Sequence, residues 1–362
     1  MTEKLQVVDP RRAPPAAPEC APELLAYLLR YAVLAPSRHN TQPWLFEVEG
    51  PELRVYADLR RALPAADPDG RELAMSCGAA LHNVEVAASH FGRASSVELL
   101  PGGRKDGLLG RLTLEERQTP GPLDEELFAA LPVRRTNRLA FDAREPPVGL
   151  LTALTREAAA YGASLRIIEQ AERPAVAELV AEGDRIEWSS PPFRAEVAAW
   201  SRLNRSGARD GMPGYVQGMS EPAAALHRLF VRLRPDAGAE ERRDRHYALH
   251  TRALLLLSTA RDHGSDWVAA GRAMQRVLLR AAAHGLSASY FSQAVEVPRL
   301  RAGLREALGE RAHPQLLFRL GFGRALSPTP RRAPAEVLRS VRSSAPERGL
   351  VGPIGSDHAV SP

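Results

Sequence analysis

Cysteine and lysine are scarce in this sequence, and long apolar runs are missing. The two cysteines, Cys20 and Cys77, lie far apart, so they provide neither a metal-binding spacing nor a disulfide framework. No stretch approaches the run of about 18 apolar residues that a membrane helix needs, and the N-terminus lacks the apolar segment of a secretion signal. These absences predict a cytoplasmic protein with no membrane partner and no structural zinc site.

The basic residues are almost all arginines, because lysine occurs only as Lys4 and Lys105. The formal net charge is +5, but the positive charges are spread along the chain and form no basic block. Nucleic-acid binding is therefore not favoured. Since arginine is so common here, a pair of arginines supports a functional assignment only where the surrounding residues support it too.

The rest of the composition is that of a globular protein. A chain of 362 residues with 44% hydrophobic residues can build a sizeable core. Residues 1–20 and 325–362 are rich in Pro, Ser and Arg without apolar periodicity, so we predict mobile or surface-wrapping tails there.

Helical and strand patterns alternate through the folded body and predict an α+β fold. After Pro22, a helical pattern runs up to Pro36, and residues 44–50 and 53–58 alternate like the strands of a hairpin. The long helix predicted at 71–91 carries small residues that would allow close packing against another element. Further strands are predicted at 95–100, 111–116, 164–169, 287–292 and 315–323, with helices at 123–131 and 267–283 and an apolar run at 253–260.

Residues 189–222 interrupt the helical segments with many residues that break helices. They include the sequence SSPP and the residues Gly207, Gly211, Pro213, Gly214 and Gly218. We interpret this insertion as a lid or a long surface loop.

Two segments of the chain resemble each other. The stretch from Gly78 to Gly92 aligns without gaps with the stretch from Gly271 to Gly285, and a predicted strand follows each at the same offset. Although alanine-rich helices align easily, the matching glycines at both ends indicate an internal duplication.

The sequence APSRHNTQPW, from Ala35 to Trp44, is the first motif that suggests chemistry. The spacing resembles the A-P-S-x-x-N-x-Q-P-W loop of the nitroreductase family, which precedes a strand. This resemblance implies that the loop orients a flavin ring, whose edge offers carbonyl acceptors and an N–H donor with which short side chains such as Ser37 and Asn40 could pair. The alternative is an ordinary turn, with Trp44 as a core residue.

A second motif, PVRRTNRLAF, spans Pro132 to Phe141. The planar fork of arginine suits a phosphate, and Thr136 adds a donor beside Arg134. A solvated arginine run is the alternative. The motif resembles the start of the nitroreductase phosphate site, with threonine in place of serine, and this resemblance implies that Arg138 stabilises charge on the reduced flavin ring.

Two later segments complete the resemblance. GLSASYFSQAVE, from Gly285, matches the place where the family puts backbone groups beside the flavin, although the usual Glu-Gly is absent and a buried strand would also explain the pattern. PTPRRAPAEVL, from Pro328, resembles the basic tail that returns to the flavin phosphate. The resulting candidate FMN-binding residues are Pro36, Ser37, Arg38, Asn40, Gln42, Arg134, Arg135, Thr136, Arg138, Tyr290, Phe291, Ser292, Arg331 and Arg332.

The order of these motifs implies one flavin site per chain. The ring-orienting loop comes first and the phosphate motif about a hundred residues later, as in the Acg-like branch of the family, to which RRALPAADPDGREL, from Arg60, is also similar. The resemblance implies tandem nitroreductase-like halves at 21–122 and 123–324, the second containing the insertion at 189–222, flanked by an N-terminal tail at 1–20 and a C-terminal arm and tail at 325–362. We expect a monomeric pseudo-dimer.

The resemblance implies an FMN-dependent oxidoreductase in which NAD(P)H reduces nitroaromatic or quinone-like acceptors. No catalytic acid, base or nucleophile follows from the motifs. One alternative is a protein that sequesters FMN under its insertion with little turnover, and another is an interaction protein without flavin. His246 and His250 have a spacing that could bind a metal, but no third ligand accompanies them, so we interpret them as surface histidines.

Overall fold

The first half of the chain forms an antiparallel sheet covered by helices. The computed structural model describes residues 17–100, 107–233 and 238–339. The sheet has the strand order β1-β2-β4-β3, and its outer pair β1–β2 is the predicted hairpin, in register from Trp44 opposite Ala57 to Glu49 opposite Glu52. Its elements are α1 (Ala21–Ala32), the 3-10 turns η1 (Arg38–Asn40) and η2 (Leu59–Arg61), β1 (Trp44–Glu49), β2 (Glu52–Ala57), α2 (Arg71–His90), β3 (Arg93–Leu99), β4 (Leu108–Arg117) and α3 (Pro122–Ala130).

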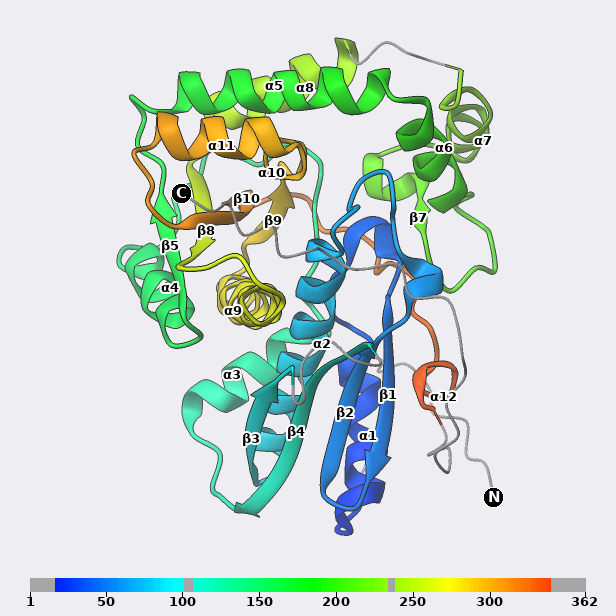
Figure 1. Ribbon diagram of the computed structural model, residues 1–362, viewed down its shortest axis with the longest axis vertical. Helices are drawn as coiled ribbons and strands as arrows, with labels where there is room; N and C mark the ends of the chain where they lie inside the picture. Colours follow the sequence, from blue (N-terminus) through cyan, green and yellow to red (C-terminus); the bar gives the residue numbers. More distant parts are fainter. Residues whose placement is uncertain (1–16, 101–106, 234–237, 340–362) are drawn as a thin grey trace, which may run out of the picture.

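The second half repeats this topology. Its strand order is β5-β8-β10-β9, again antiparallel, and a long helix again joins the second strand to the third. Helices α5, α8 and α11 cover the face of this sheet that α9 leaves free (Figure 1). Its elements are α4 (Leu150–Ala159), β5 (Ala163–Ile167), α5 (Arg173–Ser189), α8 (Gly238–His250), β8 (Ala253–Thr259), α9 (Gly264–Ala283), β9 (Ser287–Tyr290), α10 (Gln293–Glu296), α11 (Pro298–Ala307) and β10 (His313–Gly321).

The helices α2 and α9 cross in close contact where the two halves meet (Figure 1). A Cβ atom on Gly78 would lie 2.1 Å from the carbonyl oxygen of Val268, and one on Gly271 would lie 2.0 Å from that of Met75. Each carbonyl belongs to the residue three positions before the opposite glycine, so the contact has approximate two-fold symmetry. The glycines that the internal similarity pairs thus have equivalent places in the two halves.

The insertion contains the helix α6 where its breaker residues suggested a loop, and the helix α7 begins at its end and continues beyond residue 222. Its elements are α6 (Pro191–Trp200), β6 (Ser201–Arg202), β7 (Met212–Pro213), η4 (Gly214–Gln217) and α7 (Glu221–Phe230). Ser190 accepts a hydrogen bond from the amide of Phe193, and Ser220 accepts one from Ala223, so both serines are N-caps. The prolines that follow them occupy the first turn, where proline favours a helix. The sequence SSPP therefore starts a helix.

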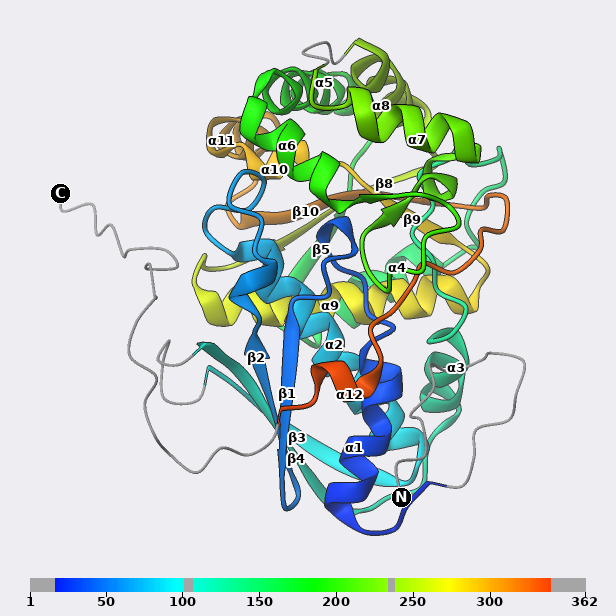
Figure 2. The ribbon, with the colours of Figure 1, turned by 90° about the vertical axis from the view of Figure 1, so that its right-hand side faces the viewer.

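The C-terminal arm returns to the first half (Figure 2). After β10 the chain runs to α12 (Pro334–Val337), Leu338 pairs with Phe46 of β1, and the Arg339 amide donates to the Phe46 carbonyl at 2.7 Å. Val337 is fully buried, so this part of the predicted tail is anchored. Residues 1–16 and 340–362 of the predicted tails lie outside the described residues. None of the described helices combines the length and hydropathy needed to cross a membrane.

The helix crossing leads to a first prediction. Gly78→Ala and Gly271→Ala should each lower the free energy of unfolding by about 3 kcal/mol, because the new methyl group would overlap a backbone carbonyl that cannot move aside. Urea denaturation followed by circular dichroism measures this loss. Gly303→Ala on α11 is the matched control: its nearest neighbour is the flexible Leu179 side chain at 3.3 Å, so a loss of similar size there would contradict the explanation.

Candidate functional site

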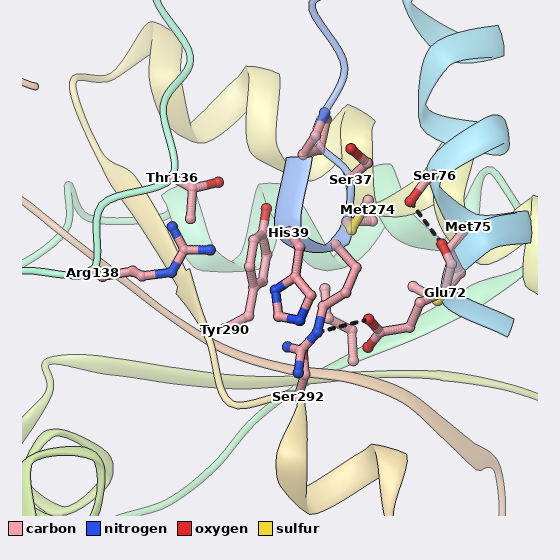
Figure 3. A pocket seen from close by; sticks show the side chains of 13 residues that line it. Ser37, His39, Glu72, Met75, Ser76, Thr136, Arg138, Met274, Tyr290 and Ser292 are labelled. Carbon is pink, nitrogen blue, oxygen red and sulfur yellow. Dashed lines mark hydrogen bonds and ion pairs between the residues drawn. The ribbon is translucent and has the colours of Figure 1, made fainter. Parts of the chain in front are cut away.

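A cavity with about 640 Å³ of empty space, part of it open to solvent, lies between the two halves. The loop before β1, helix α2, the segment after α3 and the end of β9 form its walls (Figure 3). Seven of the predicted site residues border it. These are Pro36, Ser37, Arg38, Thr136, Arg138, Tyr290 and Ser292.

The loop from Pro36 to Pro43 has an unusual backbone. His39, Asn40 and Gln42 have φ values of 49°, 56° and 52°, in the left-handed region that side chains other than glycine rarely adopt. The Ser37 hydroxyl accepts a hydrogen bond from the Gln42 amide at 2.9 Å, which closes the loop on itself. Such a backbone persists only where surrounding contacts hold it.

The side chains of Asn40 and Gln42 supply those contacts. The Asn40 amide nitrogen donates to the carbonyls of Gly211 and Pro330 at 3.0 and 3.1 Å, and its oxygen accepts from Arg331 at 3.0 Å. The Gln42 oxygen accepts from the Arg332 amide at 2.8 Å. The sequence analysis predicts that Asn40 pairs with a flavin ring. In the structure, the side chains of Asn40 and Gln42 instead form hydrogen bonds that connect the loop to the insertion and to the C-terminal arm.

Arg134 and Arg331 form a positively charged cluster with unused donors. Both donate to the Leu34 carbonyl, at 3.5 and 3.3 Å. Among the described residues, Nε and Nη1 of Arg134 and Nε of Arg331 are buried without an acceptor. Burial, together with the charges of Arg134 and Arg135, lowers the pKa of Arg331 to about 9, so it remains protonated at neutral pH.

Such a cluster suits an anion. Buried charges in proteins are ordinarily paired, and burial also lowers the pKa of Arg134 and, with the charge of Arg134, brings that of Arg135 to about 10. A phosphate would accept hydrogen bonds from these guanidinium groups and neutralise their charge. The predicted phosphate residues therefore fit an FMN phosphate by the chemistry of their unused donors.

Two predicted residues have structural roles instead. Arg332 donates to the carbonyls of Gln42 and Glu336 at 3.0 and 2.9 Å, which fixes the arm against the loop. The Phe291 side chain is 1% exposed and belongs to the core beneath α5 and α8, on the other side of the strand from the cavity.

Thr136 and Arg138 reach the cavity because their segment runs along the edge of β9. Thr136 forms an isolated parallel bridge with Ala288, and the Asn137 amide donates to the Ala288 carbonyl at 2.8 Å. This pairing sets Thr136 and Arg138 beside Tyr290 (Figure 3). Burial and the charge of Arg38 lower the pKa of Arg138 to about 10, and its guanidinium lies 4.0 Å from the sulfur of Met212.

Arg38 is surrounded by carboxylates. Its guanidinium lies 2.9 Å from Glu296 and 3.8 Å from both Glu72 and Glu187. Burial alone would lower its pKa, but the three carboxylates raise it above the ordinary value. One guanidinium cannot neutralise three carboxylates, and burial raises the pKa of Glu187 and of Glu296.

Sequence reasoning missed part of the cavity wall. His39 borders it, and burial, with the charges of Arg38 and Arg138, lowers its pKa far enough to keep the ring neutral. Glu72, Met75 and Ser76 border it from one face of α2. Glu72 lies inside the segment RRALPAADPDGREL noted in the sequence, and Met75 and Ser76 follow it at helical spacings of three and four residues, which is the signal that could have identified them.

A second cavity adjoins the first. It contains about 1200 Å³ of empty space between α5, α8, β9 and the insertion. The two cavities share wall residues, so the space beside Tyr290 meets the space beneath the insertion. The shared residues are Arg38, His39, Arg138 and Tyr290.

Comparisons with known proteins show where the chain has relatives. No family model matches the sequence. The chain is 33% identical over 316 residues to "Putative NAD(P)H nitroreductase Rv3131" of Mycobacterium tuberculosis H37Rv, covering 86% of this chain and 89% of the relative. It is 28% identical over 318 residues to "Putative NAD(P)H nitroreductase acg" of the same organism, and the match covers 86% of this chain and 93% of the relative. Among solved structures, the FMN and NADPH-dependent nitroreductase NfnB of Sphingopyxis sp. strain HMH is 18% identical with a TM-score of 0.39. The match covers 62% of this chain and 99% of the NfnB chain.

The unused donors of Arg134 lead to a second prediction. Arg134→Met should raise the free energy of unfolding of ligand-free protein by about 1 kcal/mol or more, because it removes a buried charge that lacks a carboxylate partner. Thermal unfolding without phosphate or flavin measures the change. The control is Arg319→Met, which should destabilise the protein, because Arg319 donates to the Leu139 carbonyl at 2.9 Å and lies over the rings of Phe141 and Tyr247. Destabilisation of both variants to the same degree would show that Arg134 is an ordinary structural arginine.

Proposed function

The chain belongs to the NAD(P)H nitroreductase family, and on this premise we propose that it is an FMN-dependent oxidoreductase, in which NAD(P)H reduces nitroaromatic or quinone-like acceptors. The observation that carries the proposal is the set of buried guanidinium donors on Arg134 and Arg331 that lack acceptors among the described residues. Arg134 interacts electrostatically with Tyr290, which borders the cavity between the halves. Bound FMN would supply the electron transfer chemistry, and the protein would bind and orient it.

Arg134, Arg135 and Arg331 would hold the phosphate of this cofactor. They come from the segment after α3 and from the C-terminal arm, so the site forms only when the arm packs against the first half. The bonds of Asn40 to Arg331 and to the Pro330 carbonyl connect the arm to the loop at the cavity. Loop geometry and phosphate binding would therefore depend on each other.

The residues that line the cavity would orient the ring. Ser37 and Thr136 offer hydroxyl groups, and the neutral His39 imidazole offers one donor and one acceptor. Arg138 has no ion pair with a carboxylate in the described part of the chain, so its charge is available to a ligand that becomes more negative on reduction.

The insertion would limit the access of water to this site. Asp210 forms an ion pair with Arg61 of η2 at 2.9 Å, and the Gln42 side-chain nitrogen donates to the Arg209 carbonyl at 2.8 Å, so the insertion is bonded both to η2 and to the ring-orienting loop. A closed site of this kind protects a reduced cofactor from side reactions. The same closure would also allow FMN to be sequestered without turnover, so an experiment has to distinguish sequestration from catalysis.

Absorbance spectroscopy tests the proposal directly. The purified protein should show the absorbance of an oxidised flavin, and anaerobic addition of NADPH or NADH should bleach it. Oxidised flavin that persists with excess of both nicotinamides would contradict the oxidoreductase assignment and favour sequestration. Protein that folds without flavin and does not take up added FMN would contradict the cofactor assignment itself.

The phosphate site has a separate test. Arg134→Met combined with Thr136→Val should abolish FMN retention through gel filtration, because the cluster loses a guanidinium and a hydroxyl donor. The matched control is Arg144→Met, since Arg144 is exposed and pairs with Asp142. Circular dichroism establishes that each variant is folded. Full FMN retention by the double variant would place the phosphate elsewhere.

A further inference from the structure

The second cavity, beneath the insertion, has a carboxyl group in its wall that the proposed function leaves unused. Asp184 on α5 lines this cavity, is 4% exposed, and has one carboxyl oxygen, Oδ2, without a hydrogen-bond partner among the described residues. Gly183 brings α5 close to the segment after β9, because a Cβ atom there would lie 2.8 Å from the Gln293 side chain. Close packing therefore holds Asp184 at the cavity wall.

Two carboxyl groups, one guanidinium and one amide surround Asp184. Glu187 lies one turn further along α5, and Asp244 and Arg243 face it from α8, while Gln293 faces it from α10. Arg243 is itself paired with Asp244 at 2.8 Å. Burial and the charges of Asp244 and Glu187 outweigh the Gln293 hydrogen bond and Arg243, and they raise the pKa of Asp184 to about 8. At neutral pH this side chain is a carboxylic acid.

We propose that the cavity beneath the insertion receives the electron acceptor and that Asp184 is the acid that protonates it. The inference rests on the proposed function, and it adds both the place of the acceptor and a catalytic residue. Aromatic rings of Trp188, Phe193 and Tyr247 line the cavity and suit a flat aromatic acceptor. Because this cavity shares Tyr290 and Arg138 with the proposed flavin cavity, an acceptor placed here would lie next to the ring.

The proton balance defines the acceptor class. A quinone or nitro compound that takes up two electrons and one proton becomes an anion, and its oxygen needs a second proton. The O–H bond of Asp184 breaks, an O–H bond forms on the acceptor, and the carboxylate that remains regains a proton from water. The electrons come from NAD(P)H by way of the flavin. An acceptor that takes up single electrons without protons, such as ferricyanide, does not need this acid.

This difference gives the test. In stopped-flow experiments on flavin-loaded protein, Asp184→Asn should leave reduction by NADPH unchanged and should slow reoxidation by a quinone by at least about a hundredfold, the lower end of the usual range for general acid catalysis. Reoxidation by ferricyanide should not change. Glu178→Gln is the matched control, because Glu178 lies on the exposed side of the same helix and pairs with Arg245. In the unsubstituted protein, the quinone rate should fall as the pH rises through about 8, and the variant should lose this dependence.

A stability measurement supplies a readout that needs no flavin. The unfolded chain releases the Asp184 proton near pH 3.8 and the folded protein releases it near pH 8, so the free energy of unfolding falls as the pH rises between these values. In Asp184→Asn this part of the decrease in the free energy of unfolding should be absent, and in Glu178→Gln it should remain.

Three results would overturn the inference: an unchanged quinone rate in Asp184→Asn, an equal slowing with quinone and ferricyanide, or an unchanged dependence of stability on pH. Each can occur in protein that binds flavin and is reduced by NADPH, so the inference can fail while the proposed function stands. Protein without flavin, or flavin that no nicotinamide reduces, would instead contradict the proposed function.

Discussion

The contact between α2 and α9 is the constraint on which the rest of the structure depends. Backbone meets backbone at Gly78 and Gly271, so the two helices approach more closely than any side chain would allow. The same stretches of helix also carry Met75 and Met274, which border the cavity between the halves. The distance between the halves, and hence the width of the cavity, is thus fixed by two positions that have no side chain.

The loop and the arginine cluster depend on this fixed frame. Three residues with left-handed backbone conformations persist in the loop because Asn40 and Gln42 are bonded to the insertion and the arm. The arm in turn places Arg331 beside Arg134, where burial and repulsion both oppose two unpaired charges. The other interactions of the folded chain keep these two charges close together. An anion that binds between them would offset their repulsion and stabilise the folded protein.

The sequence predicted the elements of this fold better than the roles of individual side chains. Strands and long helices follow from local periodicity, and the α+β fold is confirmed. The helices at 191–200 and 221–230 were missed because proline breaks a helix in its interior but favours its first turn. The Asn40 side chain bonds to the carbonyls of Gly211 and Pro330, which are distant in the sequence, so local sequence could not show whether it faces a ligand or holds the loop in place. His39 was missed because its neutrality comes from burial between two arginines, which no local pattern shows.

Arg38 and His39 border both cavities, and the wall of the second cavity also contains the carboxyl groups of Asp184, Glu187 and Asp244. Elsewhere, Arg134, Arg135 and Arg331 lie together without a carboxylate partner in the part of the chain that the structure describes. Around Arg38, three carboxyl groups outnumber the cation that they surround, and burial raises the pKa of Glu187 and of Glu296. Because burial and two neighbouring arginines keep His39 neutral, it adds no charge to the wall that the two cavities share, and the charges of that wall are those of Arg38 and Arg138.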